Sequence, residues 1–180
     1  MNKVLLLIII SLLVSCSNDP QAIQKPDPIK LGRDDVGYYM QMIVADHAGP
    51  KAQLWLSDQS KPLWFVDVRD AILFKRTPEE ADNISAIYAH DMAKNPDYNN
   101  VKDIWLDIEQ AFFVIGSQRK GGMGMPEAIP FSEKHSARDF VAKYGGEIID
   151  SINQISTEYL TSIPGMSGAD PSQFMKHNKN

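Results

Sequence analysis

Sulfur-bearing side chains gather in one glycine-rich stretch of this 180-residue chain. Residues 121–127 have the sequence Gly-Gly-Met-Gly-Met-Pro-Glu, so Met123 and Met125 stand two positions apart among glycines and before a proline. Glycine lets a backbone approach other groups closely, and proline stiffens it. The same Met-x-Met spacing occurs upstream at Met40 and Met42. Because thioethers are soft ligands that favour Cu(I), the two pairs predict a copper site.

Borderline and hard ligands stand near these methionines in the sequence. His90 and Asp91 precede Met92, and His47 follows Asp46. Imidazole and carboxylate suit a divalent ion such as zinc, so the two histidines with either aspartate could hold a second ion beside copper. The candidate metal ligands are Met42, Met123, Met40, Met92, Met125, His47, His90 and Asp91, with Asp46 as a further carboxylate.

Each of these residues also has a purely structural interpretation. Methionine readily fills gaps in a hydrophobic core. Asp46 and Asp91 suit turns, and the histidines beside them could be solvated or hydrogen-bonded. The repeated Met-x-Met spacing favours a site, because residues two apart on a strand face the same side. Met40 and Met42 would then present both sulfurs together.

The first 15 residues have the pattern of a lipoprotein signal peptide. Lys3 supplies positive charge, and the apolar run Val4–Val14 is shorter than the roughly 20 residues of a membrane-spanning helix. The sequence Leu-Val-Ser-Cys at 13–16 predicts cleavage before Cys16 and lipidation of its thiol, the alternative being an ordinary cysteine near a cleavage site. Ser17, and not an aspartate, stands directly after Cys16, which favours the outer membrane, facing the periplasm. The proline-bearing residues 16–33 predict a tether.

A strand, strand, helix, strand order is predicted for the first half of the domain. Residues 52–56 alternate as a strand does and residues 63–66 form a second apolar run, so the two predict a hairpin. Asp67 is a good N-cap for a helix over 68–75, and residues 84–88 predict the third strand.

The same order is predicted to repeat in the second half. Residues 104–108 and 112–115 are apolar runs of strand character. Ser132 would cap a helix over 133–144 that Gly-Gly closes, and residues 147–149 predict a last strand. The predicted fold is α+β, one compact domain of two ββαβ units.

The predicted domain boundaries follow from these elements. A single domain over 34–160 contains the two halves, about 34–95 and 100–150, and a possible further helix over 151–160. The polar segment 161–180 predicts a disordered tail.

Composition excludes several classes of function. The formal net charge is −5 and the sequence has no basic block, so nucleic acid is not an expected partner. Cys16 is the only cysteine, and lipidation removes it as a nucleophile. The sequence lacks both a glycine-framed serine and the spacing of a phosphate-binding loop. These features disfavour an enzyme.

Five segments together resemble the NosL family of lipoprotein copper chaperones for nitrous oxide reductase. They are Met42–Pro50, Lys61–Phe65, Arg69–Ile72, Ala86–Tyr88 with Asp91 and Met92, and Gly116–Glu127 with its Gly-Gly-Met-Gly-x-Pro-Glu element. The family position of His90 varies, so His90 matches only partly. The resemblance covers about residues 35–149. It implies two ββαβ units resembling part of the organomercurial lyase fold, in agreement with the predicted repeat.

The resemblance carries metal-binding methionine roles to Met42 and Met123, and less directly to Met92. Relatives usually have Cys-Gly-Met where this chain has Met40, Gln41 and Met42. A neutral thioether therefore stands where relatives have a thiol. Met125 falls at a variable position of the loop element, and only its own chemistry supports it.

The predicted function is that of a periplasmic Cu(I) metallochaperone. The resemblance implies apo nitrous oxide reductase as the acceptor, membrane-bound assembly factors as further partners, and a role in denitrification. Thioethers need no deprotonation, so copper binding would depend little on pH. One alternative is a metal-free docking lipoprotein that positions assembly factors at the membrane. Another is an enzyme related to the lyase fold.

Overall fold

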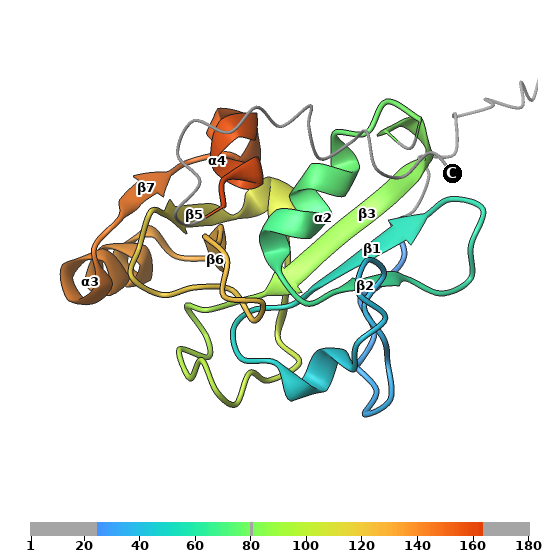
Figure 1. The fold of residues 1–180 in the computed structure, drawn as a ribbon, viewed down its shortest axis with the longest axis horizontal. Coiled ribbons are helices and arrows are strands. Elements are labelled where there is room, and N and C mark those ends of the chain that lie inside the picture. Colours follow the sequence, from blue (N-terminus) through green and yellow to red (C-terminus); the bar gives the residue numbers. More distant parts are fainter. Residues whose placement is uncertain (1–24, 80, 164–180) are drawn as a thin grey trace, which may run out of the picture.

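Two antiparallel sheets, joined by α2 and a shared core, make up the domain in a computed structural model that describes residues 25–79 and 81–163 (Figure 1). The first sheet has the strand order β2-β1-β3-β4 and the second the order β6-β5-β7. The strands are β1 Ala52–Leu56, β2 Leu63–Phe65, β3 Ile84–His90, β4 Trp105–Asp107, β5 Phe112–Ile115, β6 Ile129–Phe131 and β7 Glu147–Ile149. The α-helices are α2 Val68–Lys75, α3 Lys134–Tyr144 and α4 Thr157–Thr161, and the 3-10 helices are Val44–Asp46, Ala81–Asn83, Ile108–Gln110 and Ile152–Gln154.

The first half confirms the predicted ββαβ order. Strands β1 and β2 pair antiparallel, with Ala52 opposite Phe65, and β3 pairs with the other edge of β1. Helix α2 spans the predicted residues Val68–Lys75. Val68, Ala71 and Ile72 are buried together, because residues three and four apart on a helix share one face.

The second half has the same order but not from the predicted strands. We expected residues 104–108 to open it, but β4 pairs with β3 and belongs to the first sheet. The opening strand is β5, followed by β6, which we did not predict because it contains Pro130. A proline lacks the N–H of a strand and is tolerated at a sheet edge, which is where β6 lies. In both units the first strand therefore lies between the other two, in the orders β2-β1-β3 and β6-β5-β7.

The helix ends also differ from the sequence prediction. Helix α3 begins at Lys134 with Glu133 in the N-cap position, and the Ser132 hydroxyl makes no hydrogen bond. Residues 151–160 form a 3-10 turn and then α4 rather than one helix.

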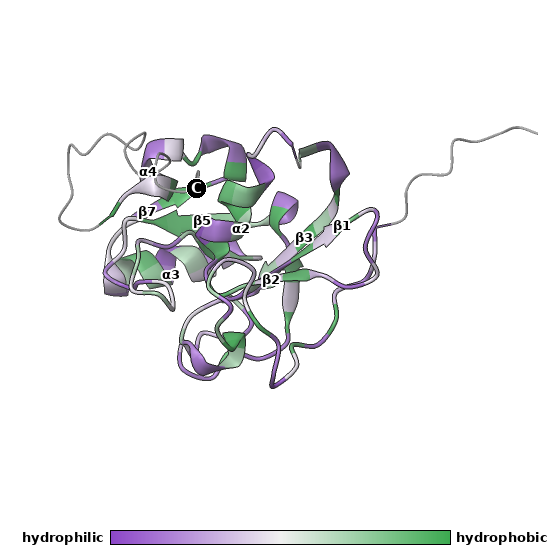
Figure 2. Cartoon of the chain, turned by 45° about the vertical axis from the view of Figure 1, so that its right-hand side comes forward, coloured by the Kyte–Doolittle hydropathy of each residue, from purple (hydrophilic) through white to green (hydrophobic). Residues whose placement is uncertain are grey.

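One core connects the two halves. Leu54, Phe65 and Ile72 of the first half pack in the same cluster as Phe113 and Ile155 of the second. Figure 2 shows β5 hydrophobic over its length, with polar residues on the outer surfaces of the helices. Full burial of one such side chain contributes about 1.5–3 kcal/mol. No helix within the described ranges is long and apolar enough to cross a membrane.

Residues 25–31 lie against the first sheet, although we expected a tether as far as Arg33. Gln53 exchanges two hydrogen bonds of 2.9 Å with the backbone of Ile29, and the Tyr88 hydroxyl donates to the Pro26 carbonyl. Buried Gln53 would otherwise leave a polar amide unsatisfied. The predicted signal peptide, Cys16 and the tail beyond residue 163 lie outside the described residues.

Candidate functional site

The methionine-bearing loop between β5 and β6 is a tight hairpin. Lys120 pairs with Pro126 across its base, and the Gly121 N–H donates to the Met125 carbonyl at 2.9 Å. The Gly124 N–H closes the turn by donating to the Gly121 carbonyl. Gly124 has φ 75°, a left-handed conformation that glycine takes without steric cost. The tip that carries Met123 is therefore ordered by its own backbone.

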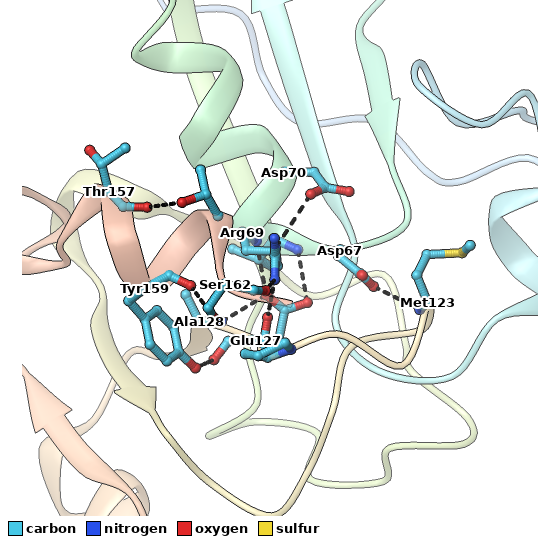
Figure 3. A network of polar contacts seen from close by, with 12 residues as sticks. Asp67, Arg69, Asp70, Met123, Glu127, Ala128, Thr157, Tyr159 and Ser162 are labelled. Atoms are coloured by element: carbon cyan, nitrogen blue, oxygen red, sulfur yellow. Dashed lines mark hydrogen bonds and ion pairs between the residues drawn. The ribbon is translucent and has the colours of Figure 1, made fainter. Parts of the chain in front are cut away.

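Glu127 fixes this hairpin to the N-terminus of α2. Its buried carboxylate accepts the N–H groups of Val68 at 3.1 Å and Arg69 at 2.8 Å, which are free donors of the first helical turn. The Arg69 guanidinium in turn donates to the Pro126 carbonyl at 3.2 Å. Figure 3 shows these contacts converging beneath the helix.

Asp67 contacts the loop instead of capping the helix as we predicted. It occupies the N-cap position, but its side chain makes no capping bond. Its Oδ1 accepts the Met123 N–H at 3.3 Å, and its Oδ2 has no hydrogen-bond partner. In Figure 3 the Met123 side chain extends away from the carboxylate, with its sulfur at the far end. Sequence reasoning missed these contacts, because glutamate is seldom buried and nothing in the motif indicates that Glu127 is.

Two carboxylates are thus buried close together. Burial and the neighbouring Asp67 charge raise the pKa of Glu127 well above its usual range, and burial also raises the pKa of Asp67. Burial lowers the pKa of Lys51 to about 8, against the attraction of both carboxylates. Lys51 and Arg69 are the buried cations that offset this negative charge.

His47 meets the loop from the opposite side. Its Nδ1 lies 3.3 Å from the Gly122 carbonyl oxygen, and a carbonyl can only accept, so Nδ1 carries the proton in this contact. Nε2 then keeps its lone pair, which is the arrangement of a metal-binding histidine whose other nitrogen bonds a backbone carbonyl. The approach needs a glycine, since a Cβ on Gly122 would lie 2.8 Å from the His47 Cβ.

His90 has the opposite arrangement. Its Nδ1 accepts the Lys51 N–H at 3.2 Å, so the proton of the neutral ring lies on Nε2, which is buried without a partner. Burial lowers its pKa to about 3, and the ring stacks on Trp105 at 4.0 Å. Asp91 is buried too, and its Oδ1 accepts the N–H groups of Ala93 and Ser132.

These contacts bear on the predicted divalent site. Across residues 25–79 and 81–163, no three His, Cys, Asp or Glu side chains come together as a metal-binding group. Asp46 is exposed in the 3-10 helix Val44–Asp46, whereas His90 and Asp91 are buried and occupied by backbone groups. The structure does not bring the four predicted residues together.

The methionines divide into buried and accessible ones. Met92 is 1% exposed in the core cluster around Phe131. Met123 is half-buried against Val44 and Val66, and Met125 is also half-buried. Met40 and Met42 are 56% and 38% exposed.

The Met40–Met42 segment reaches the same place as the loop. The Gly37 N–H donates to the Met42 carbonyl at 2.8 Å, and a Cβ on Gly37 would lie 3.3 Å from Val66. Met123 packs against the cluster of Val44, Trp64 and Val66. The two methionine-bearing segments therefore border the same buried apolar cluster.

Gln41 shapes the turn between Met40 and Met42. It has φ 52°, the only positive φ of a non-glycine residue in the described part of the chain. The segment is a turn, so the strand geometry that we predicted for the pair does not apply. Glycine would adopt this conformation without strain, whereas a residue with a side chain rarely does. Gln41 is held by its side-chain amide, which donates to the Tyr38 carbonyl at 3.0 Å.

Exposed apolar side chains concentrate around this turn. Six of the nine large exposed hydrophobic residues in the described ranges belong to it: Val36, Tyr38, Tyr39, Met40, Met42 and Ile43. Contiguous apolar surface of this kind is typical of an interaction site.

Comparison with known proteins assigns the family. A family model described as NosL matches residues 28–160. The chain belongs to the NosL family. Its relatives include the copper-binding lipoprotein NosL of Achromobacter cycloclastes, 38% identical over 90% of this chain and 83% of that protein. The copper-binding lipoprotein NosL of Stutzerimonas stutzeri is 25% identical over 92% of this chain and 87% of that protein.

A solved NosL structure has the same fold. The crystal structure of the copper chaperone NosL from Shewanella denitrificans has a TM-score of 0.67 and 26% identity, and the match covers 74% of this chain and 97% of that one. The mixed fold of two antiparallel sheets is therefore that of the NosL family, which confirms the predicted fold class and the resemblance.

Proposed function

We propose that this chain is a lipid-anchored Cu(I) chaperone of the periplasm that delivers copper to apo nitrous oxide reductase. Cys16 carries the lipid and holds the domain at the outer membrane. The names of the NosL relatives support copper binding, lipid anchoring and a chaperone role. Nitrous oxide reductase and its membrane-bound assembly factors come from the family resemblance.

The observation that carries the proposal is the meeting of His47 with the methionine loop. His47 donates its Nδ1–H to the carbonyl of Gly122, the residue before Met123, which leaves the Nε2 lone pair available to a metal. Met42 lies on the neighbouring turn and is accessible. Met42, Met123 and His47 are the first ligand set, since two thioethers and one imidazole suit Cu(I).

The remaining candidates rank behind these three. Met40 is exposed and Met125 half-buried, so either sulfur can complete the site. Met92 is enclosed in the core, and His90 and Asp91 are committed to backbone groups. We propose Cu(I) as the cargo without a second divalent ion.

Transfer follows from where the ligands lie. Met40 and Met42 belong to the exposed apolar turn, so an acceptor protein can bring its own ligands to the ion there. Neutral thioethers exchange for a better ligand set without proton release. The chaperone then needs no reaction beyond ligand exchange.

Leucine substitutions test the sulfur ligands. Replacing Met42 or Met123 by leucine keeps apolar volume and usually costs less than about 1.5 kcal/mol of stability. We expect each variant to bind Cu(I) at least tenfold more weakly, about 1.4 kcal/mol, in competition with a chromogenic chelator. Met92→Leu is the matched control and should bind as wild type does. Affinities of Met42→Leu and Met123→Leu within twofold of wild type would refute the site.

A further inference from the structure

We infer that Asp67 is a positioning residue for copper binding, which holds the Gly122–Met123 peptide group and through it orients both the Met123 thioether and the His47 ring. The inference rests on the proposed function and adds Asp67, which is not one of the proposed copper ligands. Asp67 itself stays clear of the ion, because the Met123 side chain extends away from it (Figure 3).

One peptide group is bonded on both sides. Its N–H, which belongs to Met123, donates to Asp67 Oδ1 at 3.3 Å. Its carbonyl, which belongs to Gly122, lies 3.3 Å from His47 Nδ1. The plane of this peptide is thereby fixed between a carboxylate and an imidazole, and the Cα that carries the Met123 side chain follows from it.

The two bonds also strengthen each other. A carboxylate that accepts a peptide N–H polarises the peptide, so its carbonyl becomes a better acceptor. A better acceptor for Nδ1–H holds His47 in the tautomer with a free Nε2 and raises the basicity of that nitrogen. Asp67 thus acts on two ligands through one peptide.

Asp67 is available for this role because Glu127, and not Asp67, caps the N-terminus of α2 with its side chain. Glu127 accepts the N–H groups of Val68 and Arg69, and the Arg69 N–H is one that an N-cap side chain would otherwise accept. Asp67 is fully buried, and its second oxygen has no partner, so helix capping does not explain it. A buried carboxylate is costly unless it is bonded, which points to a role for the bond to Met123.

The loop is shaped to receive this carboxylate. A Cβ on Gly121 would lie 2.6 Å from the Asp67 Cγ and Oδ1 and 2.7 Å from Oδ2. Even an alanine at 121 would therefore displace the short, enclosed Asp67 side chain. Gly121 and Asp67 form one contact that sets the distance between the loop and α2.

The test uses Ag(I), a soft monovalent ion, with ¹³C-methyl methionine and ¹⁵N-histidine NMR on the full chain. We expect Asp67→Ala to bind Ag(I) at least tenfold more weakly than wild type. The Met123 methyl should lose most of its Ag(I)-induced shift while the Met42 methyl keeps its own. The His47 ring should lose its single Nδ1–H tautomer, a signal that a purely structural role would leave unchanged.

Two further variants sharpen the result. Asp67→Asn keeps a carbonyl acceptor for the Met123 N–H and should bind within threefold of wild type. Asp70→Asn is the matched control, since it removes a neighbouring carboxylate that makes no bond to the loop, and it should also bind as wild type does. Equal affinities of Asp67→Ala and Asp70→Asn, with an unchanged His47 tautomer, would overturn the inference.

Gly121→Ala keeps the inference testable if Asp67→Ala does not fold. We expect it to weaken Ag(I) binding at least fivefold by displacing the carboxylate, and to add no loss when combined with Asp67→Ala. Wild-type affinity in Gly121→Ala would overturn the inference. A wild-type protein in which no methionine methyl responds to Ag(I) would instead refute the proposed function.

Discussion

His47 and His90 show how backbone contacts give one residue type two roles. His47 faces a carbonyl and keeps Nε2 free, whereas His90 accepts an N–H and is enclosed in the sheet. The sequence singled out both, since each stands beside an aspartate. It could not separate them, because the difference depends on which distant backbone group each ring meets. The same holds for Met92 and Met123, which only packing distinguishes.

Burial of His90 predicts a pH dependence of stability. Its folded pKa of about 3 lies below the ordinary value of 6.5, so the unfolded chain binds more protons between these values. Stability therefore rises with pH across this window and falls as the pH drops from 7. By pH 5 we expect a loss of about 2 kcal/mol that His90→Gln does not show, since one pKa unit is about 1.4 kcal/mol.

Urea unfolding at pH 7 and pH 5 measures this loss. His135→Gln is the control, because His135 is exposed on α3 and its removal should leave the wild-type dependence in place. Parallel changes in wild type and His90→Gln would show that the buried ring is not responsible.

At the scale of elements, sequence pattern predicted local structure well and partners poorly. Both long helices and the strands β1, β3, β5 and β7 lie where hydrophobic periodicity and turn residues placed them. Strand β4 was found but assigned to the wrong sheet, because pairing is decided by distant residues. Strand β6 was missed because Pro130 argues against a strand unless its edge position is known. The predicted Asp67 cap of α2 was also wrong, because the capping residue Glu127 comes from a distant part of the chain.

Capping of α2 by Glu127 predicts a stability effect larger than that of an ordinary cap. Glu127→Ala leaves two buried helix N–H groups without acceptors, and we expect it to cost about 2–4 kcal/mol in chemical unfolding. Glu127→Gln keeps one acceptor oxygen and removes a buried charge, so it should cost less than half as much. If the two variants lose equal stability, the capping bonds are not what Glu127 contributes.

The whole molecule folds around a core that both halves share. Leu54 and Ile72 contact the same cluster as Phe113 and Leu160. Arg76 at the end of α2 also donates to carbonyls of the C-terminal segment, at Ile155 and at the 3-10 turn before it. The proposed copper ligands likewise come from both halves, with Met42 and His47 in one and Met123 in the other.

A site that joins the halves predicts that copper stabilises the fold. Binding to the folded state alone adds about 2.7 kcal/mol when free Cu(I) is 100 times its dissociation constant. Thermal unfolding of wild type with Cu(I) and with a Cu(I) chelator should show this shift. Met123→Leu removes the proposed ligand from the second half, so its melting temperature should shift little at the same free Cu(I) concentration. Superimposable curves for loaded and chelator-treated wild type would contradict a site shared by the halves.

The capping of α2 from another part of the chain has a consequence for how a nascent chain reaches this fold. Synthesis presents the N-terminal residues first, yet the carboxylate that accepts the first N–H groups of α2 stands 59 residues after Val68. The first ββαβ unit therefore emerges with an open helix end and without the core residues that the second half contributes, such as Phe113 and Leu160. Contacts so distant in sequence slow folding, because a long loop must close before they form. We therefore expect the first half to complete its folding only after the methionine hairpin has formed. The same segment that we propose to hold copper also completes the domain.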